Sequence, residues 1–221
     1  MAGTITALEV QKHNNERVNV YLDDEFAFGL TLIEAAHLRK GQHLTDAEIG
    51  ALKSTDAVEQ AYERAVRFLG NRPRSIAEVR RNLSDKEVDA SAVDEVIARL
   101  EARGYVDDAA FARYWVSNRQ QFKPRGSRAL RFELREKGVP NAVIDEVLAE
   151  LDVSDAAYQA ASDKARRLRG LDKRDFRTKL GAYLARRGFD YETIGEVITR
   201  LIDETEEGDA DAFAPSHDIE E

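Results

Sequence analysis

Apolar residues recur in three segments of the chain with nearly the same spacing. The first set runs from Val79 to Leu100, the second begins 51 positions later at Leu130, and the third begins a further 50 positions on at Leu180. The last four apolar positions of each set are spaced i, i+3, i+4, i+7, which is the pattern of one buried helical face. The pattern therefore predicts three copies of one helical unit.

Each copy is predicted to contain three helices. We expect the first helices at residues 58–69, 109–122 and 156–168, with Asp108 and Asp155 as N-caps of the second and third. The third helices are expected to start near Ser91, Pro140 and Asp190.

The middle helices carry start and stop signals. Ser75 and Glu78 form a capping box in the first copy, while the other two middle helices end at Gly138 and Gly188, where glycine can adopt the left-handed conformation. Glu87 occupies that position in the first copy, so its middle helix is expected to stop differently.

The first part of the chain has a different period. Between residues 4 and 30, apolar and polar residues alternate in a way that predicts strands, with a strand near 5–10 followed by a hairpin that turns at Asp23–Glu25. Two short helices should follow, opened by capping boxes at Thr31 and Thr45. Residues 54–56 (Ser-Thr-Asp) are interpreted as the junction with the helical copies.

Together these patterns predict a mainly α protein made of tandem three-helix repeats in an elongated array, with a small N-terminal β-rich module and a disordered acidic C-terminal tail. The predicted parts are a β-meander plus two short helices at 1–54, repeats at 58–104, 105–152 and 153–203, and the tail at 204–221. A unit of about 50 residues has a thin core, so neighbouring repeats should share apolar surface.

Charge changes this picture mainly at the C-terminus. The net charge is −9, but nine acidic and no basic residues follow position 202, so the rest of the chain is neutral. Such a tail is typical of disordered segments. It either competes for basic surfaces elsewhere in the chain or only increases solubility.

Several functional classes are disfavoured. The chain has no cysteine, and its four histidines show no ligand spacing, so we expect neither a metal nor another cofactor. No apolar run is long enough to span a membrane and no leader precedes the first strand, which favours a cytoplasmic protein, and we expect a monomer. Asp107 and Asp108 lie where a helix must be capped and lack partners for acid–base chemistry, so no enzyme is predicted.

Basic residues are concentrated in the second and third repeats. Residues 113–137 contain eight basic and two acidic side chains, whereas 138–163 contain six acidic and none basic. Arg128, Arg131 and Arg135 should form a ridge on the helical face opposite Leu130 and Leu134. The ridge is either a binding edge for a phosphate backbone or an acidic protein, or a solvated helical face, and the acidic third helices argue against a surface that only wraps DNA.

Aromatic residues near this ridge are expected to be structural. We predict that Phe111, Tyr114, Trp115 and Phe132 form core or inter-repeat contacts rather than stacking platforms for bases.

The segment around the second repeat resembles a known family. Gly104, Tyr105, Asp107, Asp108 and Phe111, with the residues that continue the motif, resemble RecX, the bacterial regulator of the RecA recombinase; the continuing residues are Trp115, Arg119, Gly126, Glu133, Leu134 and Gly138. The resemblance covers about residues 58–202, and residues 1–54 resemble a β extension of some members.

The resemblance implies a regulatory protein that modulates, mostly inhibits, RecA. It implies binding in the groove of the RecA filament on single-stranded DNA, with effects on DNA repair, homologous recombination and the SOS response. The alternative is an independent helical DNA-binding module of helix-turn-helix type that reads duplex DNA without a protein partner.

Two residue sets follow from this interpretation. The candidate partner- or DNA-binding residues are Arg72, Arg74, Arg113, Arg119, Lys123, Arg125, Arg128, Arg131, Arg135, Lys173, Arg174 and Arg177. The candidate structural residues are Gly104, Tyr105, Asp107, Asp108, Phe111, Trp115, Leu134, Gly138 and Gly188.

Overall fold

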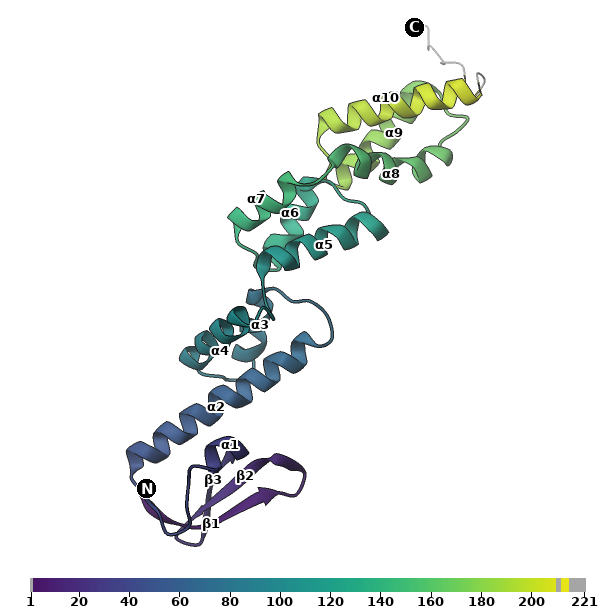
Figure 1. The fold of residues 1–221 in the computed structure, drawn as a ribbon. Helices are drawn as coiled ribbons and strands as arrows, with labels where there is room; N and C mark the ends of the chain where they lie inside the picture. The colour runs from purple at the N-terminus through teal and green to yellow at the C-terminus, as the bar shows by residue number, and fades with distance from the viewer. Residues whose placement is uncertain (1, 210–211, 215–221) are drawn as a thin grey trace. The chain divides into compact units, whose positions relative to one another are not determined.

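A computed structural model describes residues 2–209 and 212–214 (Figure 1). The chain forms two compact units, Met1–Val106 and Asp107–Glu221. The first unit contains the sheet and the first three-helix repeat, and the second contains the other two repeats.

The first unit begins with an antiparallel sheet whose strand order is β3-β2-β1-β4. The strands are β1 (Gly3–Gln11), β2 (Asn14–Leu22), β3 (Glu25–Thr31) and β4 (His43–Leu44). The predicted meander is therefore confirmed, and β4 is a fourth strand that the alternation did not predict. Apolar residues of one face, such as Val20 and Leu30, are fully buried because they pack beneath the helices that follow.

One position breaks the predicted alternation. Phe26 is 61% exposed, although Phe28 on the same strand is buried. The cause is a register shift between Val20 and Tyr21, after which Phe26 pairs with Tyr21. The two rings meet edge-on, with centroids 6.0 Å apart, on the solvent side of the sheet.

The helix after the sheet is much longer than predicted. Helix α1 (Leu32–Ala35) is capped by Thr31, and α2 (Asp46–Leu69) opens with the expected box at Thr45. However, α2 continues through residues 54–56, so the predicted junction there is wrong. Ser, Thr and Asp are weak helix formers, but contacts on both sides of this point outweigh their preference.

Those contacts come from two cores and one ion pair. Ile49 packs into the core under the sheet, and Val58 packs into the core of the first repeat. Between them, Asp56 is buried and accepts hydrogen bonds from Arg17 Nη2 of β2 at 2.9 Å and from Gln60 Nε2 at 2.6 Å. Helix α2 therefore belongs to both the N-terminal module and the first repeat.

The first repeat is completed by α3 (Ile76–Ser84) and α4 (Ala90–Ala102), with the predicted Ser75 capping box present. Its middle helix does not stop differently from the others, because Glu87 adopts a left-handed φ of 59° where the later repeats have Gly138 and Gly188 at 76° and 86°. The backbone geometry is thus common to all three repeats. Only the residue type differs.

Replacing Glu87 by glycine should stabilise the first unit by about 1 kcal/mol, because a side chain in the left-handed region costs about 1–2 kcal/mol and glycine avoids most of that cost. Thermal unfolding of the purified variant measures the effect. Lys86→Gly is the matched control, since Lys86 is exposed and has no positive φ. A Glu87→Gly protein no more stable than this control would contradict the assignment.

The second unit contains two further repeats, each with three helices. Their bounds are α5 (Asp108–Phe122), α6 (Ser127–Glu136), α7 (Asn141–Ala149), α8 (Val153–Arg166), α9 (Lys173–Arg186) and α10 (Tyr191–Gly208). The predicted apolar positions form two cores, in which Leu130, Leu134, Leu180 and Leu184 are fully buried.

Both predicted N-caps of the first helices are displaced. Asp107, not Asp108, caps α5, and its Oδ1 accepts hydrogen bonds from the Ala109 and Ala110 amides at 2.7 and 3.0 Å. Asp152, not Asp155, caps α8, three residues earlier than expected. Each helix starts earlier than the apolar pattern indicated, because an acidic residue upstream can satisfy the free amides of the first turn.

The aromatic residues of the second repeat divide between core and surface. Phe111 is buried and Trp115 packs partly buried against the same core. Tyr114 and Phe132 are instead 43% and 66% exposed, so the prediction that they form core or inter-repeat contacts is wrong. On α6, Phe132 lies outside the stripe formed by Leu130 and Leu134.

The second and third repeats meet through backbone at two glycines. Gly126 N donates to Arg187 O at 3.0 Å, Arg128 N donates to Gly188 O at 3.3 Å, and the Arg187 side chain donates to Pro124 O at 3.0 Å. A Cβ atom on Gly126 would lie 2.3 Å from Gly188 O. Only glycine fits where the two chain segments approach this closely.

Gly126→Ala should therefore destabilise the second unit by about 1–3 kcal/mol, the usual cost of overpacking a filled site. Chemical denaturation of the whole protein measures this effect. Gly195→Ala is a suitable control, because a Cβ there meets nothing within 4 Å and alanine is favoured inside a helix. Equal stability of the two variants would show that the repeats do not approach through Gly126.

The C-terminal segment is more ordered than expected. Helix α10 extends to Gly208, so residues 204–208 of the predicted disordered tail are helical. Glu204 accepts hydrogen bonds from Tyr158 and Arg200, and Thr205 Oγ1 donates to Leu201 O, which holds the last turns. The rest of the predicted tail, apart from 209 and 212–214, lies outside the described residues.

Residues 212–214 also pack on the third repeat. Phe213 meets Phe176 edge-on with centroids 5.2 Å apart, Gly170 N donates to Ala212 O, and Ala214 N donates to Leu171 O. Phe213 was not recognised in the sequence because it stands alone among small and acidic residues.

Candidate partner-binding surface

The candidate basic residues differ mainly in whether they already pair with a carboxylate of the same chain. In the first repeat, Arg72 binds Glu78 through two hydrogen bonds of 2.7 and 3.2 Å. Arg74 lies 4.0 Å from Glu78 and stacks over Phe68 at 4.0 Å, and burial lowers the pKa of its guanidinium. These contacts attach the start of α3 to α2, which is a structural role.

A similar cluster surrounds Glu133 in the second repeat. Its carboxylate accepts hydrogen bonds from Trp115 Nε1 and Arg119 Nε, both at 2.7 Å, and lies 3.0 Å from Arg125 Nε. Arg119 also stacks over the Trp115 ring at 4.5 Å. The side chain of Glu133 is only 17% exposed, so this cluster ties α5, α6 and the loop between them together.

The predicted arginine ridge on α6 is largely occupied by neighbours on α7. Arg131 forms an ion pair with Asp145, and Arg135 Nε donates to Asn141 Oδ1 at 2.9 Å. Of the three ridge residues, only Arg128 makes no side-chain hydrogen bond or ion pair within the described part of the chain. One arginine of the ridge, Arg128, is therefore available to a partner, whereas the other two are already bonded to α7.

Arg113 on α5 is engaged in the same way. It binds Glu146 of α7 and Glu150, the residue that follows α7, and its hydrogen bonds hold the pKa of the exposed Glu150 below its usual value. Lys173 pairs with Glu206. These residues attach one helix of a repeat to another.

A bridge between the middle and third helices distinguishes the repeats. Arg80–Asp94 in the first repeat and Arg131–Asp145 in the second occupy equivalent positions, 51 residues apart. The third repeat has Gly181 and Gly195 at these two positions. Both members of the bridge are therefore absent from the third repeat.

Four candidate cations make no side-chain hydrogen bond or ion pair among the described residues: Lys123, Arg128, Arg174 and Arg177. All four are exposed and belong to the second unit. On α9, Arg174, Arg177, Gly181 and Ala185 fall on one helical face, a stretch of about 16 Å at 1.5 Å per residue.

Arg128 stands at a groove where α6 meets the end of α9 and the start of α10. The groove has a volume of about 440 Å³ and is also lined by Ala185, Phe189 and Tyr191. Tyr191 is 90% exposed, and Phe132 is exposed on α6. Cations beside exposed aromatic rings can bind either nucleic acid or protein, through charge and stacking together.

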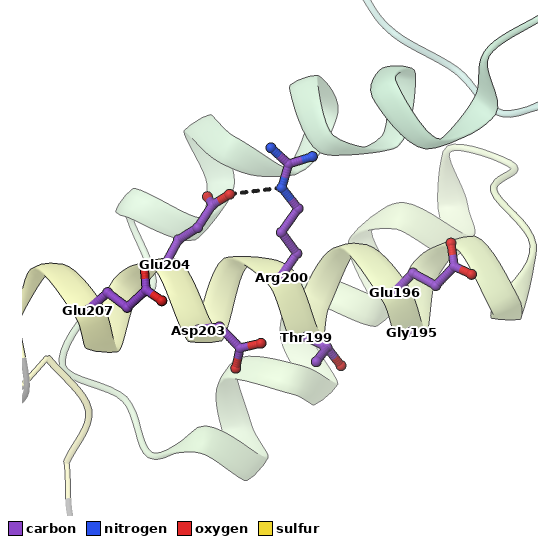
Figure 2. A pocket seen from close by; sticks show the side chains of 7 residues that line it. All are labelled: Gly195, Glu196, Thr199, Arg200, Asp203, Glu204 and Glu207. Atoms are coloured by element: carbon purple, nitrogen blue, oxygen red, sulfur yellow. Dashed lines mark hydrogen bonds and ion pairs between the residues drawn. The ribbon is translucent and has the colours of Figure 1, made fainter.

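Helix α10 presents the opposite charge. Glu196, Thr199, Arg200, Asp203 and Glu207 lie along one side of the helix, where Figure 2 shows Arg200 and Glu204 directed toward each other. Arg200 Nε donates to Glu204 Oε1 at 2.8 Å, so the positive charge of Arg200 is neutralised. Most basic residues of the second unit lie instead on α5, α6, α9 and the end of α8.

Several of the candidate structural residues lie at helix ends or are buried. Gly104 takes a φ of 69° just after α4, Asp107 caps α5, and Asp108 is buried. Tyr105 is 56% exposed.

Within the described residues, no group of three or more His, Cys, Asp or Glu side chains is arranged to hold a metal ion. No described helix is long and apolar enough to cross a membrane.

These features define a tandem three-helix repeat protein with an N-terminal antiparallel sheet. Four family models match in chain order: the regulatory protein RecX N-terminal domain at 3–45, and the first, second and third three-helix domains of RecX at 61–100, 107–148 and 150–198. The chain belongs to the RecX family of regulatory proteins.

Individual relatives agree along most of their length. Regulatory protein RecX of Bacillus pumilus (strain SAFR-032) is 32% identical over 92% of this chain and 79% of its own. The protein of the same name from Geobacillus thermodenitrificans (strain NG80-2) is 33% identical over 96% and 82%.

Solved structures support the fold. A crystal structure of a regulatory protein RecX superimposes with a TM-score of 0.74 at 26% identity, over 90% of this chain and 99% of the other. RecX from Lactobacillus salivarius gives a TM-score of 0.62 at 21% identity, over 67% and 98%, which is a likeness of fold alone.

Proposed function

We propose that this protein regulates a RecA recombinase, mostly as an inhibitor, by binding the filament that RecA forms on single-stranded DNA. Binding in the filament groove would hinder a second DNA from entering, with effects on repair, recombination and the SOS response. No chemical step by the regulator is needed. The partner is inferred from RecX family membership, and the surface is inferred from the side chains described above.

The observation that carries the proposed surface is the set of four cations whose side chains make no hydrogen bond or ion pair among the described residues. Lys123, Arg128, Arg174 and Arg177 can approach a phosphate or carboxylate without first breaking an internal ion pair. Arg113, Arg119 and Arg131 would have to give up bonds that stabilise the repeats. A filament offers both phosphates and carboxylates, so the proposal does not depend on which of them each cation meets.

The activity test is the DNA-dependent ATPase and strand exchange of RecA with this protein at stoichiometric ratio. We expect both to fall, and we expect the inhibition to weaken as salt rises, because charge contacts with polyanions release bound counterions. Unchanged ATPase and strand exchange at every salt concentration would refute the proposed function.

The helix-turn-helix alternative makes a different prediction. It requires sequence-selective binding to duplex DNA in the absence of RecA. Selection from a random duplex library tests this directly, and we expect no sequence to be enriched.

A further inference from the structure

The first unit contains a groove that includes none of the four cations proposed to bind the filament. It lies where α1 meets α2 and α4, has a volume of about 540 Å³, and is lined by residues between Glu16 and Arg103. An extension of it continues past Val66. All of its walls belong to Met1–Val106.

One wall of the groove is apolar and exposed. Helix α1 is a single turn, yet Leu32 and Ile33 are 47% and 76% exposed, and Val66 beside the extension is 37% exposed. Single exposed aliphatic residues are common on protein surfaces, but these line a concave site. Covering them would remove apolar area from water, which favours an apolar side chain in the groove.

The wall formed by α2 and α4 is held in place by its own contacts. The Tyr62 ring contacts the guanidinium groups of Arg99 and Arg103 at 4.5 and 5.1 Å, and its hydroxyl accepts a hydrogen bond from Arg103 at 2.7 Å. Arg99 is also bound by Glu59 through two hydrogen bonds, which raise the pKa of the guanidinium. Arg99 is therefore paired with a carboxylate, whereas Arg103 keeps its charge and is bound by the neutral Tyr62 side chain.

Acidic side chains outnumber basic ones in the groove, which is lined by Glu16, Glu34, Glu59 and Glu63 and by Arg99 and Arg103. Glu16 of β2, Glu34 of α1 and Glu63 of α2 line it, and none of the three has a basic partner in residues 2–209 or 212–214. Arg67 lines only the extension past Val66. Three carboxylates from three different elements thus surround an apolar wall, an arrangement that attracts cations and repels a phosphate backbone.

We propose that this groove docks a basic segment of a partner protein, in which an apolar side chain flanked by Lys or Arg covers Leu32 and Ile33. Its flanking cations pair with Glu16, Glu34 and Glu63. The site differs in charge and in location from the cations of α6 and α9, so the inference does not rest on the proposed function. The chain would then bind two partners, or two segments of one partner, through surfaces of opposite charge.

The test uses a fluorescein-labelled amphipathic peptide of Leu and Lys, with its leucines on one helical face, and the full-length protein. Fluorescence anisotropy gives the affinity, and amide hydrogen exchange locates the site. We expect protection at residues 31–34 and 59–66. The double variant Glu34→Lys, Glu63→Lys should bind at least about tenfold more weakly, and Ile33→Ser at least about fivefold.

The matched control is Glu192→Lys, Glu196→Lys on α10, which changes the net charge equally and should leave the affinity within about twofold. Equal weakening by both double variants would mean attraction to net charge alone and would overturn the proposal. The alternative occupant of the groove is a second copy of this chain. Sedimentation equilibrium of the wild type and of Ile33→Ser tests for this self-association. Self-association that Ile33→Ser abolishes, with no peptide protection at residues 31–34, would assign the groove to a second copy of this chain and would also overturn it.

Discussion

Replacing Asp56 by alanine should destabilise the first unit by about 3–5 kcal/mol, because the change leaves the Arg17 guanidinium without its partner in a mostly buried position. The side chains of Arg17 and Asp56 are only 14% and 7% exposed, so solvent can replace little of the lost interaction. Denaturant unfolding of the full chain measures the loss. The same substitution should also release Gln60, which hydrogen-bonds to Asp56.

A double variant separates the ion pair from simple helix preference. Arg17→Leu together with Asp56→Leu removes both charges and should recover most of the lost stability, since well-packed apolar residues often replace a buried pair without cost. If Asp56→Ala unfolds like the wild type, α2 is not fastened to β2 through this pair.

Leu134→Ala should cost about 2–5 kcal/mol, the usual range for truncating a fully buried leucine. Leu134 has no exposed surface and packs in the core of the second repeat with Leu130, Ile144 and Val147. The effect should appear in the unfolding of the second unit. Phe132→Ala, two residues away and exposed, is the control and should change stability by less than about 0.5 kcal/mol.

A loss below about 1 kcal/mol for Leu134→Ala would mean that the cavity collapses without penalty, and the assignment of this face as core would be wrong. A large loss for Phe132→Ala would show that the ring is covered in solution.

The cores of the repeats could be predicted from the sequence because helical periodicity records burial directly. Val79, Leu130 and Leu180 stand at equivalent positions, and all three are fully buried. The glycine stops at Gly138 and Gly188 were likewise predictable from local conformation. Glu87 was not, since its left-handed backbone follows from the shared geometry of the repeat and not from its own preference.

Local sequence patterns could not predict that α2 continues without a break. Asp56 sits among weak helix formers, and its partner Arg17 is 39 residues away in a strand. No periodicity connects the two positions, so the sequence favoured a break where the structure has a helix. Contacts distant along the chain decided this element.

The candidate binding residues show the same limit. Arg128, Arg131 and Arg135 share a helical face, yet the latter two are engaged by α7. A usable signal did exist, because Arg80–Asp94 and Arg131–Asp145 have the same separation of 14 residues in successive repeats. An arginine that repeats together with a carboxylate indicates a bridge, whereas one that repeats alone is available for a partner.

The most direct test of the proposed surface is the affinity for a RecA filament assembled on labelled single-stranded DNA. The variant has alanine at Lys123, Arg128, Arg174 and Arg177. Its matched control has alanine at four exposed cations of the first unit: Lys12, Arg39, Lys40 and Lys86. We predict at least about tenfold weaker binding for the variant, equivalent to ~1.4 kcal/mol, and wild-type binding for the control. Equal dissociation constants for the two proteins would contradict the account.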